Sequence, residues 1–258
     1  MSKYGFNTLA SEIVADLPRR VAGKKFVITG ASASSLRGNT ALYLAAGKPS
    51  AIILLARTAS KVEPVIKEIA SISIMAVPHE TSKEGIESQF GVNHIGHFLV
   101  TNLLLPKIAN GGRIVNVASN GHALGGVRFD DHNFQDGKVY DEWEAYGQSK
   151  TADVAFSLQP GVASTSLSGH LDPATTNWTG IMKRISSRGV RAVQEFKSID
   201  EACATIVAAA VDPSLEEFSG AYLDDCNPTP ATPEATGDEN AERLWKLSQE
   251  LVGEKFTY

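Results

Sequence analysis

Tyr146 and Lys150 are the residues whose types and spacing point most directly to chemistry. Four positions apart, they lie on one face of a helix. The positive charge of a lysine favours the phenolate form of a neighbouring tyrosine, so such a tyrosine can give or take a proton while a hydride moves to or from a nicotinamide. The same spacing also fits a surface helix with an unrelated tyrosine and lysine, and the rest of the chain has to decide between the two interpretations.

Length and composition set the broad class. The chain has 258 residues, of which 43% are hydrophobic and 21% charged, enough for one α/β domain with a sizeable core. A net charge of −5 does not favour nucleic acid or an anionic membrane surface as a partner. No apolar run approaches the ~20 residues that span a bilayer, and the N-terminus lacks a signal-peptide layout, so we expect a cytoplasmic protein. Cys203 and Cys226 are expected to be buried thiols rather than a disulfide.

Short apolar runs alternate with helical patterns in the N-terminal third. Strands are predicted at 25–30 and 51–56, and helices at 7–17, 38–46 and 59–70. This order indicates a doubly wound parallel sheet, in which both strands are buried.

The remaining elements are predicted from the same patterns. They are a strand at 71–77 beside the first strand, a long helix at 84–109, a strand at 112–119, an irregular loop at 121–144, a mixed polar region at 166–198, a helix at 200–211 capped by Asp200, a last strand at 219–223, a connector at 227–237 and a closing helix at 238–252. Residues 154–158 admit two interpretations. Either the tyrosine helix ends soon after Lys150, or these residues stay helical and a strand is lost.

Several segments resemble the short-chain dehydrogenase/reductase family, and they follow one another in the family order. They are Thr29-Gly30 after the first strand, the stretch G-I-E-S-Q-F-G-V-N-H-I-G-H-F-L-V-T-N around Asn93, Ser119 at the end of a strand, Tyr146 with Lys150, and Pro160-Gly161. The separation of Ser119 from Tyr146, 146 − 119 = 27 positions, suits the retinol-dehydrogenase-like branch of fungal type.

The resemblance implies a single Rossmann-like oxidoreductase domain over residues 1–258, with a shortened sheet. Two internal family segments are missing from this chain. The first is a strand, a helix and a strand ending in N-N-A-G before Ile74, and the second is the last part of the tyrosine helix.

The resemblance also implies roles for individual residues. Tyr146 would transfer the proton, Lys150 would support it, Ser119 would hydrogen-bond the substrate oxygen, and Asn93 would anchor a water chain. The residues expected to bind the cofactor are Gly30, Ser35, Leu36, Arg57, Asn93, Tyr146, Lys150, Val162 and Thr165.

The phosphate-binding turn departs from the family pattern. Residues 34–37 (S-S-L-R) stand where the later family glycines would fall. A Cβ atom at this crowded turn can block a phosphate, whereas the serine hydroxyls and Arg37 could hydrogen-bond it. Arg57 directly follows the second strand, where an arginine would meet a 2′-phosphate, so NADP is favoured over NAD.

The function expected from the resemblance is NADP-dependent interconversion of a carbonyl and an alcohol on a small apolar molecule. The alternative is an inactive member that acts as a binding or interaction module, which the missing segments and the glycine-poor turn favour. His94 and His97 are too few for a metal site, and Asp130 and Asp131 fit a solvated loop. A homo-oligomer through the tyrosine helix is compatible with the family, although the shortened helix weakens that expectation.

Overall fold

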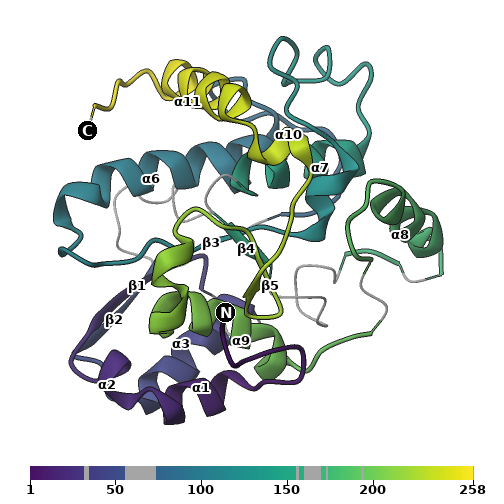
Figure 1. The fold of residues 1–258 in the computed structure, drawn as a ribbon. Helices are drawn as coiled ribbons and strands as arrows, with labels where there is room; N and C mark the ends of the chain where they lie inside the picture. Colours follow the sequence, from purple (N-terminus) through teal and green to yellow (C-terminus); the bar gives the residue numbers. More distant parts are fainter. Residues whose placement is uncertain are drawn as a thin grey trace.

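The computed structural model describes residues 1–31, 35–55, 74–154, 157–159, 170–172, 174–192 and 195–257. Its strands lie between two groups of helices (Figure 1). The group below the strands in that view is α1 (Ala10–Asp16), α2 (Pro18–Val21), α3 (Leu36–Ala46) and α9 (Ile199–Val211). The group above them is α6 (Gly96–Leu104), α7 (Glu142–Val154), α10 (Pro233–Thr236) and α11 (Asp238–Val252).

The β-structure of the described residues falls into two sheets. In the first, β1 (Lys25–Thr29) pairs in parallel with β2 (Ala51–Leu55). The second has the order β3 (Asn116–Val117), β4 (Ser157–Gln159), β5 (Leu223–Asp224) and β6 (Asn227–Pro228), with parallel pairing up to β5 and an antiparallel hairpin to β6. The prediction of a mixed α/β fold with parallel strands is confirmed, and the strands predicted at 112–119 and 219–223 are much shorter than expected.

The single strand predicted at 71–77 is wrong for residues 74–77, which form no strand, while 71–73 lie outside the described residues. Within the described chain, no strand pairing joins β1 to β3. The reason lies in the hydrogen bonds of Ile74. Its backbone N–H donates to Asn93 Oδ1 at 2.9 Å and its carbonyl accepts from Asn93 Nδ2 at 2.8 Å, so a side chain takes the place of a strand partner.

The largest hydrophobic core lies under the first sheet, where α9 packs against α1 and α3. Apolar residues at helical spacing on α1, such as Ile13 and Val14, meet Val207 and Val211 of α9 there. Several alanines of α9 are fully buried, and their small side chains let the helices approach closely. The helices predicted at 7–17, 38–46 and 200–211 are therefore confirmed, with ends shifted by a few residues.

The N-cap of α9 is Ser198 rather than the predicted Asp200. Ser198 Oγ accepts from the Glu201 N–H at 3.2 Å, and a Glu201 carboxylate oxygen accepts from the Ser198 N–H at 2.8 Å, which completes a capping box. Asp200 accepts from the backbone N–H and the hydroxyl of Ser11 instead, and so ties α9 to α1.

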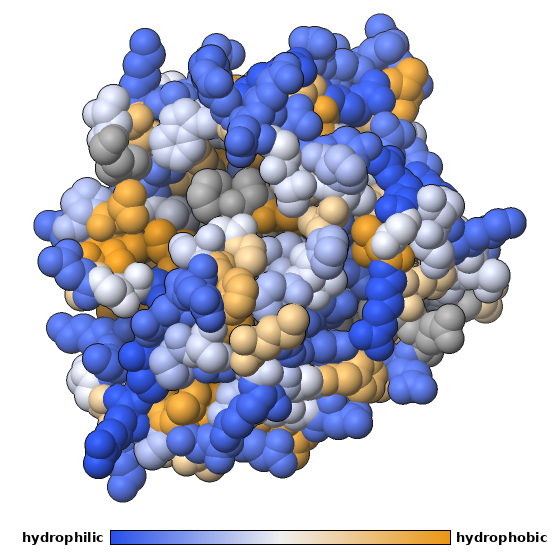
Figure 2. Space-filling model, viewed as in Figure 1, coloured by the Kyte–Doolittle hydropathy of each residue, from blue (hydrophilic) through white to orange (hydrophobic). Residues whose placement is uncertain are grey.

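Several side chains of the first sheet are exposed, so the prediction of fully buried strands is wrong at these positions. Val27 and Ile53 are paired neighbours on one face and are 49% and 48% exposed, whereas Leu54 points to the opposite face and is 51% exposed. Hydrophobic residues gather on the side of the molecule where β1, β2 and the outer end of α6 lie (Figure 2). The helix predicted at 59–70 lies outside the described residues.

The long helix predicted at 84–109 is present as consecutive helical segments. They are α5 (Ser88–Phe90), a π-helical turn η1 (Gly91–Ile95), α6, and a 3-10 turn η2 (Leu105–Lys107). It begins at Ser88 because the Glu87 carboxylate accepts from the N–H groups of Gln89 and Phe90, each at 2.8 Å.

The region after Ser119 keeps the tyrosine helix and the next strand. A 3-10 turn η3 (Asn120–Leu124) and irregular turns lead to α7, and α7 ends at Val154, soon after Lys150, so that β4 is retained. The first of the two interpretations of 154–158 is therefore correct. The polar region at 166–198 contains a helix, α8 (Trp178–Ser187), that the sequence patterns did not reveal, and η5 (Pro213–Phe218) follows α9.

The closing helix α11 forms as predicted and lies over α6 and α7. Leu244 is buried against Ile95 and Ala152, and the Trp245 ring lies 5.1 Å from that of Phe98. Both cysteines are buried and free, as expected. None of the helices in the described ranges has the length and apolar character that crossing a membrane requires.

Candidate active site

Tyr146 and Lys150 lie together on the buried side of α7. The Lys150 Nζ atom is 5.9 Å from the centre of the Tyr146 ring. The two residues are 4% and 2% exposed. Lys150 Nζ donates to the carbonyl of Val117 in β3 at 3.1 Å, and it forms an ion pair with Asp153 at 2.9 Å. The ammonium group is therefore held between the helix and the end of a strand.

Ser119 follows β3 and lies near the Tyr146 ring. Its Oγ atom accepts from the Gly121 N–H at 3.0 Å and so begins the η3 turn. A side-chain carbon at Gly121 would lie 2.5 Å from Tyr146 Cε1 and 3.2 Å from Ser119 Oγ. The tyrosine ring and the serine hydroxyl thus border the same glycine, in a place where only a residue without a side chain fits.

Close backbone packing fixes α7 against η3. A side-chain carbon at Gly147 would lie 2.3 Å from the backbone nitrogen of Gly125, so the two segments approach at these glycines. The Thr151 hydroxyl lies 2.9 Å from the His122 carbonyl oxygen and 2.7 Å from that of Gly125. These contacts set the position of Tyr146 relative to Ser119.

Asn93 lies in the π-helical turn η1 and is fully buried. Besides the two bonds to Ile74, its side chain donates to Ser149 Oγ at 2.9 Å, which connects it to α7 next to Lys150. Its backbone carbonyl lies 2.7 Å from His97 Nδ1. Such widened turns are frequent at functional sites, and here the turn brings Asn93 into contact with the helix that carries the tyrosine.

Gly30, Ser35 and Leu36 lie around the end of β1 and the start of α3. Gly30 has a φ of 65°, which favours glycine, and its N–H donates to the Leu55 carbonyl at 2.8 Å. Ser35 is the N-cap of α3, since its Oγ accepts from the Gly38 N–H at 3.0 Å, whereas Leu36 packs against the core. Arg57, Val162 and Thr165 lie outside the described residues.

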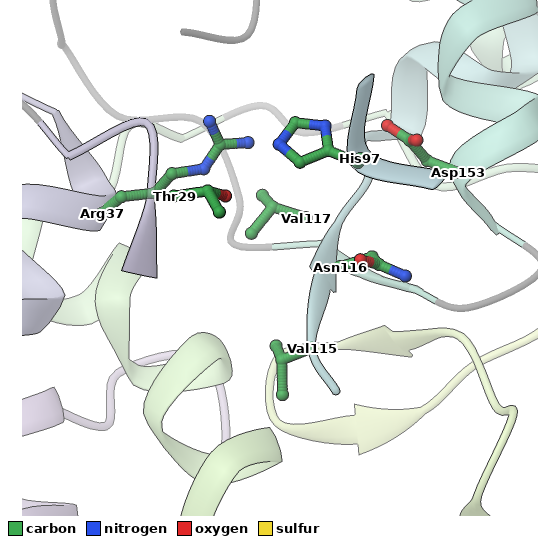
Figure 3. Close-up of a pocket in the computed structure, with 7 residues that line it drawn as sticks. All are labelled: Thr29, Arg37, His97, Val115, Asn116, Val117 and Asp153. Atoms are coloured by element: carbon green, nitrogen blue, oxygen red, sulfur yellow. The ribbon is translucent and has the colours of Figure 1, made fainter. Parts of the chain in front are cut away.

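A cavity of about 40 Å³ opens between the two sheets, at the end of β1. It is lined by Thr29, Arg37, His97, Val115, Asn116, Val117 and Asp153. The guanidinium of Arg37 points toward the His97 imidazole across it, and Asp153 lies on the far side of His97 (Figure 3). Its size suits a few water molecules.

The charges around this cavity affect one another. Burial lowers the pKa of His97 to about 4, and the positive charge of Arg37 acts in the same direction. Burial also lowers the pKa of the Arg37 guanidinium, which the Asp153 carboxylate partly opposes. At neutral pH the imidazole of His97 is therefore uncharged. Its Nδ1–H donates to the Asn93 carbonyl, which leaves Nε2 as a hydrogen-bond acceptor.

Asp153 was missed by sequence reasoning, although a signal for it existed. An acid three positions after a lysine lies on the same helix face. His97 was considered only as a metal ligand, yet its position four residues after Asn93 predicts the contact with the Asn93 carbonyl. The described ranges hold no group of three or more His, Cys, Asp or Glu side chains suited to a metal ion.

Asp130 and Asp131 are not a catalytic carboxylate pair. Asp131 forms an ion pair with Arg128 at 2.5 Å, and its Oδ1 accepts from the Gln135 N–H at 2.7 Å. The hydrogen bond from Arg128 lowers the pKa of the Asp131 carboxyl. The pair therefore belongs to a salt-bridged loop, as the sequence indicated.

Several known proteins are similar to this chain. Retinol dehydrogenase 13 of Mus musculus is 38% identical over 203 residues, which are 72% of this chain and 59% of the relative. Short-chain dehydrogenase TIC 32 A, chloroplastic, of Brassica napus is 37% identical over 206 residues (71% and 62%). Short-chain dehydrogenase/reductase prx1 of Penicillium roqueforti is 31% identical over 217 residues (71% and 61%). No family model matches the sequence.

The fold has a counterpart among solved structures. The crystal structure of an uncharacterised protein from Mycobacterium paratuberculosis superimposes with a TM-score of 0.67 over 95% of this chain and 98% of that chain, at 24% identity. This likeness concerns the fold alone. The chain spans about 60% of the length of the curated relatives that it matches. The sequence similarity nevertheless places the chain in the short-chain dehydrogenase/reductase family, in its retinol-dehydrogenase-like branch.

Proposed function

We propose that the chain is an oxidoreductase that interconverts a carbonyl and an alcohol by hydride transfer. The observation that carries this proposal is the meeting of three side chains. The Tyr146 ring and Ser119 Oγ both border Gly121, and Lys150 Nζ lies 5.9 Å from the centre of that ring. A phenol, a hydroxyl and an ammonium group in this arrangement suit proton transfer to an oxygen atom.

Each residue has a distinct role in the reducing direction. The Tyr146 hydroxyl gives its proton to the substrate oxygen, and the charge of Lys150 favours the phenolate that remains. Ser119 Oγ already accepts from the Gly121 N–H, so its own proton is available for the same substrate oxygen. Asn93 anchors the proton path through its carbonyl, which contacts His97.

The proposed cofactor is a nicotinamide dinucleotide, which supplies or accepts the hydride when bound. The donor chemistry at the end of β1 fits its diphosphate, because Gly30 leaves the backbone open and Thr29 and Arg37 border the same cavity. A volume of about 40 Å³ is far below the ~300 Å³ of a small ligand pocket. Binding therefore requires side chains that line this cavity to move. The proposal that the cofactor is NADP rather than NAD depends on Arg57. The proposed contacts with the nicotinamide depend on Val162 and Thr165.

The proposed substrate is a small apolar carbonyl compound or alcohol. Two half-buried tryptophans support this proposal. The Trp143 ring lies 6.5 Å from that of Tyr146 and 5.7 Å from that of Trp178 in α8. Both pack with Ala123 and Leu124 of η3. A substrate that approaches Tyr146 from this side meets aromatic surface.

The alternative function is that of a family member without catalysis, which acts as a binding module. The small cavity at the end of β1 and the separation of the two sheets favour it. Both features lie on the proposed cofactor side of the site, whereas the residues proposed for proton transfer, Tyr146, Ser119 and Lys150, lie close together. Cofactor binding is therefore the step that distinguishes the two functions.

We also propose that the chain is one doubly wound, Rossmann-like domain with a shortened sheet. The parallel strands with helices on both sides support this arrangement (Figure 1). A cytoplasmic location and a homo-oligomer remain predictions of the sequence.

A fluorescence titration with NADPH, and with NADH for comparison, tests the function first. Binding should enhance and blue-shift the emission of the reduced nicotinamide. No change at near-millimolar cofactor would favour the inactive module. If the cofactor binds, Tyr146→Phe should abolish turnover of an apolar aldehyde and leave the cofactor affinity within about twofold. Turnover that survives in this variant would refute the assigned proton donor.

A further inference from the structure

Asp153 is a buried carboxylate that contacts the ammonium of Lys150. It lies one helical turn after Lys150 on α7, and its Oδ2 atom is 2.9 Å from Lys150 Nζ. The two residues are 7% and 2% exposed. Lys150 Nζ has one other described hydrogen bond, to the Val117 carbonyl at 3.1 Å. Asp153 is therefore the charged partner that fixes the ammonium group within this site.

The other oxygen of Asp153 faces His94. His94 Nδ1 lies 3.8 Å from Asp153 Oδ1, and its Nε2 atom is 2.9 Å from Ser248 Oγ in α11. A serine, a histidine and an aspartate in this order resemble a hydrolytic triad, but Ser248 is fully buried and His94 is 5% exposed, so a substrate cannot reach the hydroxyl. Ser248 instead positions His94, and His94 in turn lies beside the Asp153 oxygen that does not contact Lys150.

Several charged or titratable groups face the Asp153 carboxylate from the surrounding elements. They are Lys150 on α7, His94 in η1, His97 on α6 and Arg37 on α3. Burial alone would raise the pKa of Asp153. The positive charge of Lys150 and the nearby His94 imidazole outweigh it, so the pKa lies below its usual range and the group is ionised at neutral pH.

The carboxylate at 2.9 Å and the Val117 carbonyl at 3.1 Å together restrict where the Lys150 ammonium can lie. We propose that Asp153 is a positioning residue of the active site, which holds the Lys150 ammonium beside Tyr146 and fixes the charge there. This inference rests on the proposed function for its catalytic meaning, and on the geometry alone for the contact.

Asp153→Asn is the informative variant, because the amide keeps the size of the side chain and removes its charge. We expect kcat at pH 7 to fall about tenfold, while KM for the carbonyl substrate stays within twofold. Loss of a nearby negative charge makes neighbouring protons easier to remove. The midpoint of the pH–kcat profile should therefore move to lower pH, by roughly one unit. Asp16→Asn removes a carboxylate of an exposed ion pair with Lys3 and should leave both quantities unchanged. A normal kcat with an unmoved profile in Asp153→Asn would overturn the proposal.

A thermal-unfolding cycle tests the contact without any turnover. Asp153→Asn should lower the Tm of the otherwise unchanged protein, because it leaves the buried Lys150 ammonium without its carboxylate. In a Lys150→Met background the same substitution should have little effect on the Tm or raise it, because that background has no buried ammonium. Equal Tm changes in the two backgrounds would overturn the proposal. If Asp153→Asn does not fold by itself, recovery of folding in the double variant supports the pairing, and failure of both refutes it. If the unchanged protein binds NADPH but lacks turnover, the proposed function fails while this cycle still decides the role of Asp153.

Discussion

Gly121 gives the most direct test of how Tyr146 and Ser119 are arranged. In Gly121→Ala, the new methyl carbon would lie 2.5 Å from Tyr146 Cε1 and 2.9 Å from Cδ1. Carbon atoms pack at about 3.5 Å, so the ring has to move by about 1 Å (3.5 − 2.5). A displacement of that size at a reacting group costs on the order of 10²-fold in rate. We therefore expect kcat to fall about a hundredfold.

The assay measures kcat and KM for an apolar aldehyde with NADPH, together with the Tm. Overpacking of this kind costs about 1–3 kcal/mol, so the variant should fold with a lowered Tm. Gly126→Ala is the matched control, because its methyl carbon would meet nothing closer than Glu234 Cβ at 3.8 Å. A kcat in Gly121→Ala equal to that of the control would refute the placement of the tyrosine ring against this glycine.

Two further predictions concern the cavity between the sheets. Arg37→Ala should weaken NADPH binding at least tenfold, because a charge-assisted hydrogen bond contributes about 1.5–3 kcal/mol, whereas tighter binding in a fluorescence titration would mean that the arginine blocks the site. Because burial lowers the pKa of His97 to about 4, below its ordinary 6.5, the unfolded chain takes up this proton first. Stability should thus fall as the pH falls from 6.5 to about 4, by up to ~1.4 kcal/mol per pH unit from this group. Urea unfolding of His97→Gln should show a flatter dependence over this range, and an unchanged slope would contradict the assignment.

Sequence patterns predicted helices best where the apolar spacing of a segment matches the face that it buries in the fold. The apolar spacing of α1, α3 and α11 located these helices within a few residues, and Tyr146, Lys150, Ser119 and Asn93 meet at one site. The predicted strand is wrong at 74–77, because the prediction assumed a neighbouring strand, whereas the Ile74 backbone is bonded to the Asn93 side chain. A side-chain partner from 19 positions away leaves no periodic signal.

The electrostatic part of the site was the least predictable. Asp153 on α7 and Arg37 on α3 interact only through the fold, so spacing alone could not pair these two charges, although it could pair Asp153 with Lys150. The N-cap at Ser198 did have a local signal, the S-x-x-E capping box completed by Glu201. The interaction of Arg37 with Asp153 instead depends on distant segments, for which a single sequence carries little information.

The division of the β-structure has a consequence for how the molecule opens. In the described residues, no backbone hydrogen bonds of a sheet join β1 to β3. The two sheets are held together there by hydrophobic packing of side chains from α1, α3 and α9. Regions joined only by such packing can detach as separate cooperative units. Amide protons of β1 and β2 should therefore exchange with solvent through a sub-global opening that leaves α7 and η3 folded. The half proposed to bind the cofactor would then open independently of the half proposed to transfer the proton.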